Sequence, residues 1–217
     1  MRATDCFDVS LQLLPYSFFR PLHGVLICFG KSLVRLNLSG NYLTDYAVKE
    51  WLIPVLKSCT NLKYLDVSSN ELTSSCLEQL GCVLRGKSLH ELSLSYNCFS
   101  DCFSQSISTL LIGLTSLVSL GLKACSLPSD LFDDLGLLEA LKGLTCLENL
   151  DISSNQLSLP SVMDIFFRRS IRRLDLSSNV FPCSLILTPS IAHSLGKIIL
   201  CNCSLTDHIF SSFYEYC

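Results

Sequence analysis

Charged residues are scarce in this sequence, and acidic residues slightly outnumber basic ones. Asp, Glu, Lys and Arg make up 16% of the 217 residues, and the formal net charge is −3. Proteins that bind nucleic acid through its phosphates concentrate lysine and arginine on one surface. The sequence contains no basic run of that kind, so we expect no direct nucleic-acid binding.

The sequence also lacks a hydrophobic run that fits a secretory signal or a membrane span. Asp5 and Asp8 interrupt the apolar stretch at the N-terminus, and Pro15 follows them, which is not the pattern of a signal peptide. The longest charge-free run, residues 102–122, contains eight Ser, Thr or Gln residues and is too polar for a membrane helix. We therefore expect a protein that is neither secreted nor inserted in a membrane.

Recognisable catalytic motifs are missing as well. The sequence contains no HExxH, GxSxG, Walker or GxGxxG pattern. Its four histidines are scattered, and none stands near a pair of carboxylates: His23, His90, His193 and His208. We therefore expect no enzyme activity, no cofactor and no small-molecule ligand.

Cysteine, in contrast, is abundant, with 13 in the chain. An odd number without regular spacing favours free thiols in a reducing compartment over a disulfide framework. Cys201 and Cys203 are expected to lie on opposite sides of their segment, and no second pair with zinc-ligand spacing exists. We therefore expect no metal site.

One pattern, LxxLxLxxNxL, recurs throughout the chain. LNLSGNYL at residues 36–43 and LDISSNQL at residues 150–157 are clear examples. The copies begin 24 to 30 residues apart, which is the period of a leucine-rich repeat. A worn first copy is assigned to Cys6, with Val9 and Leu11 in its next apolar slots. Seven clearer copies begin at Leu33, Leu62, Leu89, Leu117, Leu147, Ile171 and Leu195.

This repeat predicts an α/β solenoid, or horseshoe, with parallel strands on its concave face and helices on its convex face. The LxL segment of each copy forms a short strand whose successive residues point to opposite sides. The asparagine follows the strand, where its buried amide must satisfy backbone groups, because an unpaired polar group costs about 1–3 kcal/mol. This structural ladder comprises Asn41, Asn70, Asn97, Cys125, Asn155, Asn179 and Cys203.

The second half of each long copy has the apolar spacing of a helix. We predict a helix over residues 44–59, capped by Thr44 or Asp45. Pro54 should kink or shorten this helix, because proline removes a backbone donor. A second helix is predicted over residues 74–87, where Gly86 after Arg85 is a plausible C-terminal stop.

Two later helices are predicted to begin at Pro128 and Pro160, because proline is well suited to the first helical position. Residues 181–194 contain two prolines and should form an irregular segment. No linker divides the chain, so we predict one leucine-rich-repeat domain over residues 1–217, with about eight repeats, the first worn and the last incomplete. The apolar face of the final segment, residues 206–217, has no following repeat to cover it, so we interpret the chain as a fragment of a longer protein.

The strand residues that point outward form a candidate surface for binding a protein partner. Tyr64 is a possible aromatic anchor, carboxylates favour basic groups on the partner, and arginines favour its acids. A plain solvated sheet face is the other interpretation, because Ser and Asp commonly fill such slots. The alignment of the worn copy places Asp8 beside Arg35. The candidate partner-binding residues are Arg35, Asn37, Tyr64, Asp66, Glu91, Lys123, Asn149, Asp151, Arg173 and Asp175.

The alternation of asparagine with cysteine in the ladder, in repeats with a helical half, resembles the ribonuclease-inhibitor-type leucine-rich repeats. That class also includes the repeats of NOD-like receptors. The order of the copies is more particular: three asparagine copies precede one that ends in KAC, at residues 123–125, and then a copy with a long helical part. This order, over residues 33–181, resembles the C-terminal repeat region of the Tonsoku-like family.

The resemblance implies a non-catalytic scaffold module in the nucleus, with a cytoplasmic location as the alternative. Tonsoku-like proteins act at stalled or broken replication forks, and their repeat region is associated with a large helical partner of the methyl-methanesulfonate-sensitivity type. That complex promotes loading of the strand-exchange recombinase in homologous recombination. Histone binding belongs to an ankyrin region that this sequence does not contain. No motif in the family fixes the residues that contact the partner.

Two other functions remain open at this point. A ribonuclease-inhibitor-like binder of a basic nuclease needs a strongly acidic concave face, which Arg35, Lys123, Arg173 and Lys197 would weaken. The sensor region of a NOD-like receptor would have the same repeats.

Overall fold

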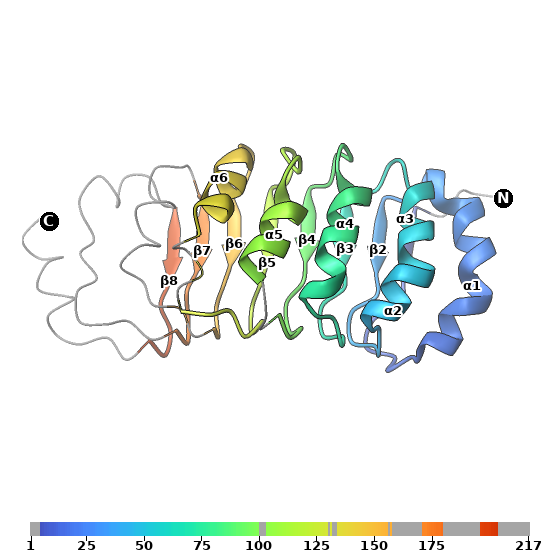
Figure 1. Cartoon of the computed structure of the whole chain (residues 1–217), viewed down its shortest axis with the longest axis horizontal. Helices are drawn as coiled ribbons and strands as arrows, with labels where there is room; N and C mark the ends of the chain where they lie inside the picture. The colour runs from blue at the N-terminus through green and yellow to red at the C-terminus, as the bar shows by residue number, and fades with distance from the viewer. Residues whose placement is uncertain are drawn as a thin grey trace, which may run out of the picture.

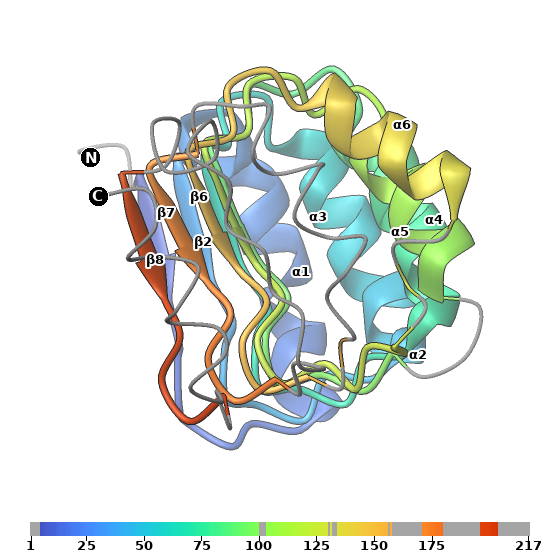
Figure 2. The same ribbon diagram turned by 90° about the vertical axis from the view of Figure 1, so that its left-hand side faces the viewer.

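The computed structural model describes residues 5–99, 103–129, 131, 134–155, 157, 171–179 and 196–203. Its strands form one parallel sheet in which each strand pairs with the next along the chain. The sheet is open, and helices cover one of its faces (Figures 1 and 2). The predicted solenoid is therefore confirmed. The eight strands are β1 (Cys6–Asp8), β2 (Arg35–Asn37), β3 (Tyr64–Asp66), β4 (Glu91–Ser93), β5 (Ser119–Gly121), β6 (Asn149–Asp151), β7 (Arg173–Asp175) and β8 (Lys197–Ile199).

The helical layer is less regular than the sheet. From β1 to β5, a helical segment follows each strand in chain order within the described residues (Figure 1). Short 3-10 turns precede or follow some helices, and a π-helical turn interrupts one of them. The segments in the described residues are α1 (Tyr16–Phe29), η1 (Gly30–Ser32), α2 (Asp45–Ala47), η2 (Val48–Leu52), α3 (Ile53–Ser58), η3 (Ser74–Cys76), α4 (Leu77–Leu84), α5 (Phe103–Leu111) and α6 (Leu135–Gly143).

The core lies between these two layers and is made mainly of leucine. The central residue of each strand from β2 to β7 is buried, while its two neighbours are at least partly exposed. Aromatic pairs fill wider parts of the core: Phe19 lies 4.8 Å from Trp51, and Phe99 stacks on Phe103 at 5.5 Å between ring centroids. Burial of a large apolar side chain contributes about 1.5–3 kcal/mol, so the repeated leucines are the main source of stability.

The ladder residues satisfy the backbone where the chain leaves each strand. The Nδ2 group of Asn155 donates to the carbonyls of Leu122 and Ile152, both at 2.9 Å. Its Oδ1 atom accepts hydrogen bonds from the backbone N–H groups of Cys125, at 2.9 Å, and Leu127, at 3.2 Å. Each asparagine thus joins its own turn to the turn of the preceding repeat.

Cysteine in the ladder changes this hydrogen-bonding pattern. The thiol of Cys125 donates to the carbonyl of Leu94 at 3.4 Å but offers no side-chain oxygen. In this position a ladder asparagine would accept a hydrogen bond from the Phe99 N–H through its side-chain oxygen. Here the Phe99 N–H donates instead to the backbone carbonyl of Cys125 at 3.1 Å. Cys203 repeats the first contact, donating to the carbonyl of Leu176 at 3.4 Å. The backbone carbonyl of Cys125 thus takes over the acceptor role that the missing amide oxygen would play.

The residue immediately before each ladder position has a left-handed backbone conformation. Gly40 has φ of +66°, and the same position has φ between 51° and 57° in the other seven copies, including Leu11 before Gln12, which the register of β1 with β2 places in the ladder slot. Only glycine, and to a lesser degree asparagine, adopts this conformation without strain. The repeat therefore imposes this turn geometry at some conformational cost. The seven positions other than Gly40 are Leu11, Ser69, Tyr96, Ala124, Ser154, Ser178 and Asn202.

The predicted alignment of the first copy is wrong by two residues. Cys6, rather than Asp8, lies beside Arg35, and Asp8 lies beside Asn37. Phe7 and Val9 take the apolar strand slots. The helix that follows, α1, was not predicted, although Pro15 precedes it and its apolar residues are spaced for burial on one side.

The predicted helix boundaries are correct in two copies and wrong in a third. Thr44 caps α2 by accepting a hydrogen bond from the Ala47 N–H at 3.4 Å, and Gly86 follows α4 with φ of +79°. Pro54 is accommodated by the π-helical turn η2, and the helix continues to Ser58. Pro128 is followed by a 3-10 turn, in which the Leu131 N–H donates to the Pro128 carbonyl at 3.2 Å. The α-helix expected from Pro128 begins later, at α6, where the Asp134 carboxylate caps it by accepting from the Leu137 N–H at 2.8 Å. The predictions for residues 160–170, 181–194 and 206–217 lie outside the described residues.

Candidate protein-docking face

The sheet face that the helices leave open carries the outward-pointing side chains of the strands. The register from β2 to β8 aligns these side chains in columns, as the sequence pattern predicts. The first column contains Arg35, Tyr64, Glu91, Ser119, Asn149, Arg173 and Lys197, and the middle column contains Asn37, Asp66, Ser93, Gly121, Asp151, Asp175 and Ile199. All ten candidate residues therefore lie on one face, with Lys123 just beyond the end of β5; whether they contact a partner stays a prediction.

At the β2 and β3 end of the face, a cation lies over an aromatic ring. The guanidinium carbon of Arg35 is 4.2 Å from the centre of the Tyr64 ring, and His90 meets that ring edge-on with 6.3 Å between the ring centres. A cation–π contact of this kind contributes about 0.5–1 kcal/mol at an exposed site. Tyr64 is half-buried and contacts both side chains, so it is a pre-ordered aromatic group on the surface.

The middle column has a structural role that the sequence reasoning missed. Oδ1 of Asp66 accepts hydrogen bonds from the Ser68 backbone N–H at 2.9 Å and from its hydroxyl at 2.6 Å. Asp151 makes the same pair of contacts with Ser153, at 3.0 and 2.6 Å. Oδ1 of Asn37 does the same without a charge. One oxygen of each carboxylate thus shapes the turn after the strand, and the Asp-x-Ser spacing is the sequence signal for it.

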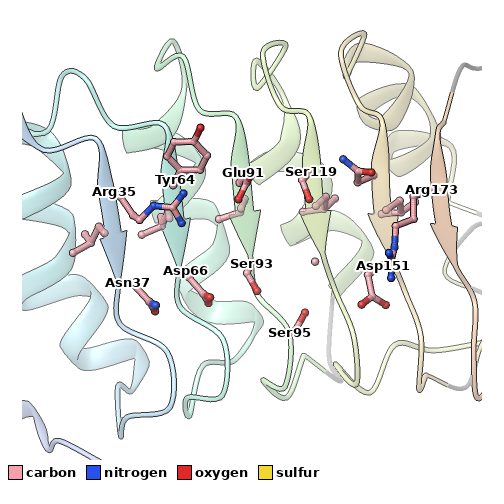
Figure 3. Close-up of a pocket in the computed structure, with 17 residues that line it drawn as sticks. Arg35, Asn37, Tyr64, Asp66, Glu91, Ser93, Ser95, Ser119, Asp151 and Arg173 are labelled. Atoms are coloured by element: carbon pink, nitrogen blue, oxygen red, sulfur yellow. The ribbon is translucent and has the colours of Figure 1, made fainter. Parts of the chain in front are cut away.

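A hollow of about 380 Å³ lies in the middle of the face. Small residues form part of its floor, among them Gly121, where a Cβ atom would be 3.0 Å from the Ser95 hydroxyl. In Figure 3, Arg35 and Tyr64 lie on one side of the hollow, and Asp151 and Arg173 lie on the other. The polar residues around it are Arg35, Asn37, Tyr64, Asp66, Glu91, Ser93, Ser95, Ser119, Asn149, Asp151 and Arg173.

The β5 to β7 end of the face combines two carboxylates with two cations. Arg173 is 4.0 Å from Asp175, which is long for an ion pair. The ammonium of Lys123 is 5.6 Å from the centre of the Tyr96 ring. Hydrogen bonding to Tyr96, with smaller contributions from Asp151 and Asp175, raises the pKa of Lys123 above its ordinary value. This end is therefore close to neutral overall, with its charges separated on the surface.

The buried cysteines of the ladder are not reactive groups. Burial raises the pKa of the Cys125 thiol to about 12 and also raises the pKa of Cys203. Cys201 is exposed, whereas Cys203 is buried, so the two side chains diverge as expected. In the part of the chain that the structure describes, no three His, Cys, Asp or Glu side chains come together as metal ligands.

None of the described helices is both long and apolar enough to span a membrane.

Comparison with known proteins supports the class that the fold defines. Models of the family described as leucine-rich repeat match residues 58–80 and 88–110. An internalin from Listeria monocytogenes has a similar solved structure, with a TM-score of 0.55 and 26% identity over 82% of this chain and 44% of that chain. The chain is therefore a leucine-rich-repeat solenoid, a fold that is typical of protein-binding scaffolds.

Within this class, the chain is similar to Tonsoku-like protein. It is 34% identical to the Bos taurus protein over 176 residues, which make up 76% of this chain and 13% of that protein. It is 35% identical to the Mus musculus protein over 68% of this chain and 11% of that protein. The resemblance that the order of repeats predicts is thus confirmed, and the chain spans only about an eighth of the length of these relatives.

A second kind of relative matches a smaller part of the chain. NACHT, LRR and PYD domains-containing protein 5 of Homo sapiens is 33% identical over 138 residues, or 61% of this chain and 11% of that protein.

Proposed function

We propose that this chain is a non-catalytic docking module of a nuclear scaffold that acts in the repair of stalled replication forks and double-strand breaks by homologous recombination. The partner is a large repair protein of the methyl-methanesulfonate-sensitivity type, held on the open sheet face. The similarity to Tonsoku-like protein over three quarters of the chain carries this proposal.

The geometry of the sheet face supports a docking role. Tyr64 is ordered by Arg35 before any partner binds, which reduces the entropy lost on association. Ordered aromatic and arginine side chains are the residues that most often dominate protein interfaces. The face also carries charges of both signs around a hollow, which would restrict the set of partners by charge complementarity.

The test is an affinity capture from nuclear extract with the parent chain and a variant that carries Tyr64→Ala, Asp151→Asn and Asp175→Asn. Asparagine keeps the Oδ1 acceptor that shapes the turn, as Asn37 does in β2, so this variant removes charge without removing the fold. A matched control carries Lys57→Gln and Glu78→Gln on the exposed side of α3 and α4. We expect a fork-repair protein to be captured by the parent and the control and lost from the face variant.

Two results would contradict parts of the proposal. Capture that survives in the face variant would move docking to the helical side or an end of the solenoid. If the parent chain captures no repair protein, the proposed nuclear function is wrong, and the similarity to Tonsoku-like protein reflects only the shared repeat.

The similarity to NACHT, LRR and PYD domains-containing protein 5 favours a second candidate, the ligand-sensing repeats of a receptor of that class. A nucleotide-binding region upstream in the full-length transcript would support this candidate, and ankyrin repeats in that position would support the scaffold.

A further inference from the structure

We propose that the hollow of the sheet face holds one arginine of the docked partner, and that acidic residues on both sides of this arginine contact Arg35 and Arg173. The inference rests on the proposed docking function and specifies the chemistry of the segment that binds.

The floor of the hollow fits a long side chain that enters from outside. Ser93, Ser119 and Gly121 come from adjacent strands and none extends far above the sheet. The same register position holds Asp151 in β6 and Ile199 in β8, so the fold accepts larger residues there. The depression is therefore a property of this stretch of sequence, and not of the repeat.

Carboxylates surround the floor on both sides. Asp66 and Glu91 lie towards the N-terminal end and Asp151 towards the C-terminal end. The turn hydrogen bonds of the two aspartates use Oδ1, and Oδ2 of each has no hydrogen-bond partner within the described residues. A guanidinium can bond to two carboxylates at once through its planar set of N–H groups, here Asp151 on one side and the longer Glu91 side chain on the other, so arginine fits this arrangement better than lysine.

The two arginines at the ends of the hollow favour acidic residues in the partner segment, on both sides of its arginine. Arg35 makes no ion pair with a carboxylate in the described part of the chain, and the contact of Arg173 with Asp175 is long. The face thus presents positive charge, then negative charge, then positive charge from β2 to β7. A partner with the opposite order, acidic, basic and acidic, is complementary to it.

The spacing of the strands translates this order into a sequence. Strands lie about 4.8 Å apart, so β5 is about 14 Å from β2 and about 10 Å from β7. An extended segment that crosses the strands rises about 3.3 Å per residue. Its acidic residues are therefore expected about four positions to one side of the arginine and about three positions to the other.

A display library of random twelve-residue peptides tests this inference with the whole chain as the target. Selections are run on the parent, on Gly121→Leu, which fills the hollow without changing charge, and on Arg35→Gln with Arg173→Gln. Gly121 does not have a positive φ, so the backbone suits leucine, but its Cβ would lie 3.0 Å from the Ser95 hydroxyl and 3.3 Å from the Ser93 hydroxyl. Both hydroxyls are side-chain ends that can turn away, and thermal unfolding of each variant verifies that it folds. Lys57→Gln with Glu78→Gln is again the control.

We expect peptides enriched on the parent to carry a central arginine with acidic residues on both sides. Their affinity should fall at least tenfold on Gly121→Leu, because charged hydrogen bonds are lost, and stay unchanged on the control. Two results would contradict the proposed arginine while leaving the docking face in place. In the first, the enriched peptides need Arg35 and Arg173 but lack a basic residue; in the second, they bind Gly121→Leu as well as the parent. If no enriched peptide depends on this face, both the arginine and the docking role of the face are wrong.

Discussion

Replacing Asn155 with alanine tests the structural ladder at a buried position. Asn155 is 5% exposed, and its Oδ1 atom is the acceptor for two backbone N–H groups, those of Cys125 and Leu127. A buried donor left without a partner costs about 1–3 kcal/mol. Two such donors give about 2–6 kcal/mol, and we expect a loss of about 3–4 kcal/mol because water can reach part of the space left by the amide.

Asn70→Ala is the matched control, because it removes the same atoms where less depends on them. Its Oδ1 atom accepts one hydrogen bond, from the Leu43 N–H at 3.1 Å, and the residue is only partly buried. We expect a loss of about 1–2 kcal/mol. Urea unfolding followed by far-ultraviolet circular dichroism measures both, with the slope against denaturant as the check that the transitions are comparable. Equal losses in the two variants, or a loss below about 1 kcal/mol for Asn155→Ala, would refute the ladder as a hydrogen-bonding device.

Three further outcomes follow from the backbone and the thiols. Gly40→Ala should destabilise the chain by about 2 kcal/mol in the same unfolding assay, because φ there is +66° and the new Cβ would be 2.5 Å from Leu11 Cδ2. Ser154→Gly should instead stabilise it by about 1 kcal/mol, since φ of +57° is relieved; no gain would mean that the conformation carries no strain. Cys125 has a folded pKa of about 12, raised by burial above the ordinary 9.0. Its contribution to stability should therefore be complete below about pH 9 and decline between pH 9 and 12. For the same reason, a thiol reagent at pH 8 should modify the exposed Cys98 but not Cys125 in the folded chain, and mass spectrometry of the labelled chain measures this.

The sequence predicted the sheet from β2 to β8 because two independent signals agree there. The apolar LxL pattern identifies the inward face, and the ladder residue fixes the position along the strand. In the first copy only the apolar pattern was used. A slip of two residues leaves every side chain on the same face, so that pattern could not distinguish Val9 and Leu11 from Phe7 and Val9. The second signal was available: Gln12 stands in the ladder slot and Leu14 follows it.

The helical half was less predictable because local signals compete there. Pro128 and Asp134 both suit a helix start, and the capping hydrogen bond of Asp134 decides the boundary of α6. Pro54 predicts a disturbed helix, but whether the chain kinks or widens into a π-helical turn depends on packing. The start of α6 and the shape of the helix around Pro54 depend on contacts with neighbouring repeats, and those contacts cannot be predicted from the sequence of one repeat.

The middle column of the sheet face separates what the fold requires from what a partner would require. Oδ1 of Asp66, Asp151 and Asp175 accepts the N–H of the serine two residues later. Asn37 meets the same requirement with an amide, so the turn by itself does not need a negative charge. At Asp66 and Asp151 the second carboxylate oxygen is therefore in excess of the structural need, whereas Oδ2 of Asp175 faces Arg173 at 4.0 Å. A cationic group on the proposed partner would account for that excess, and an aspartate-to-asparagine exchange isolates it, because it changes the charge of the face while leaving the acceptor of the turn in place.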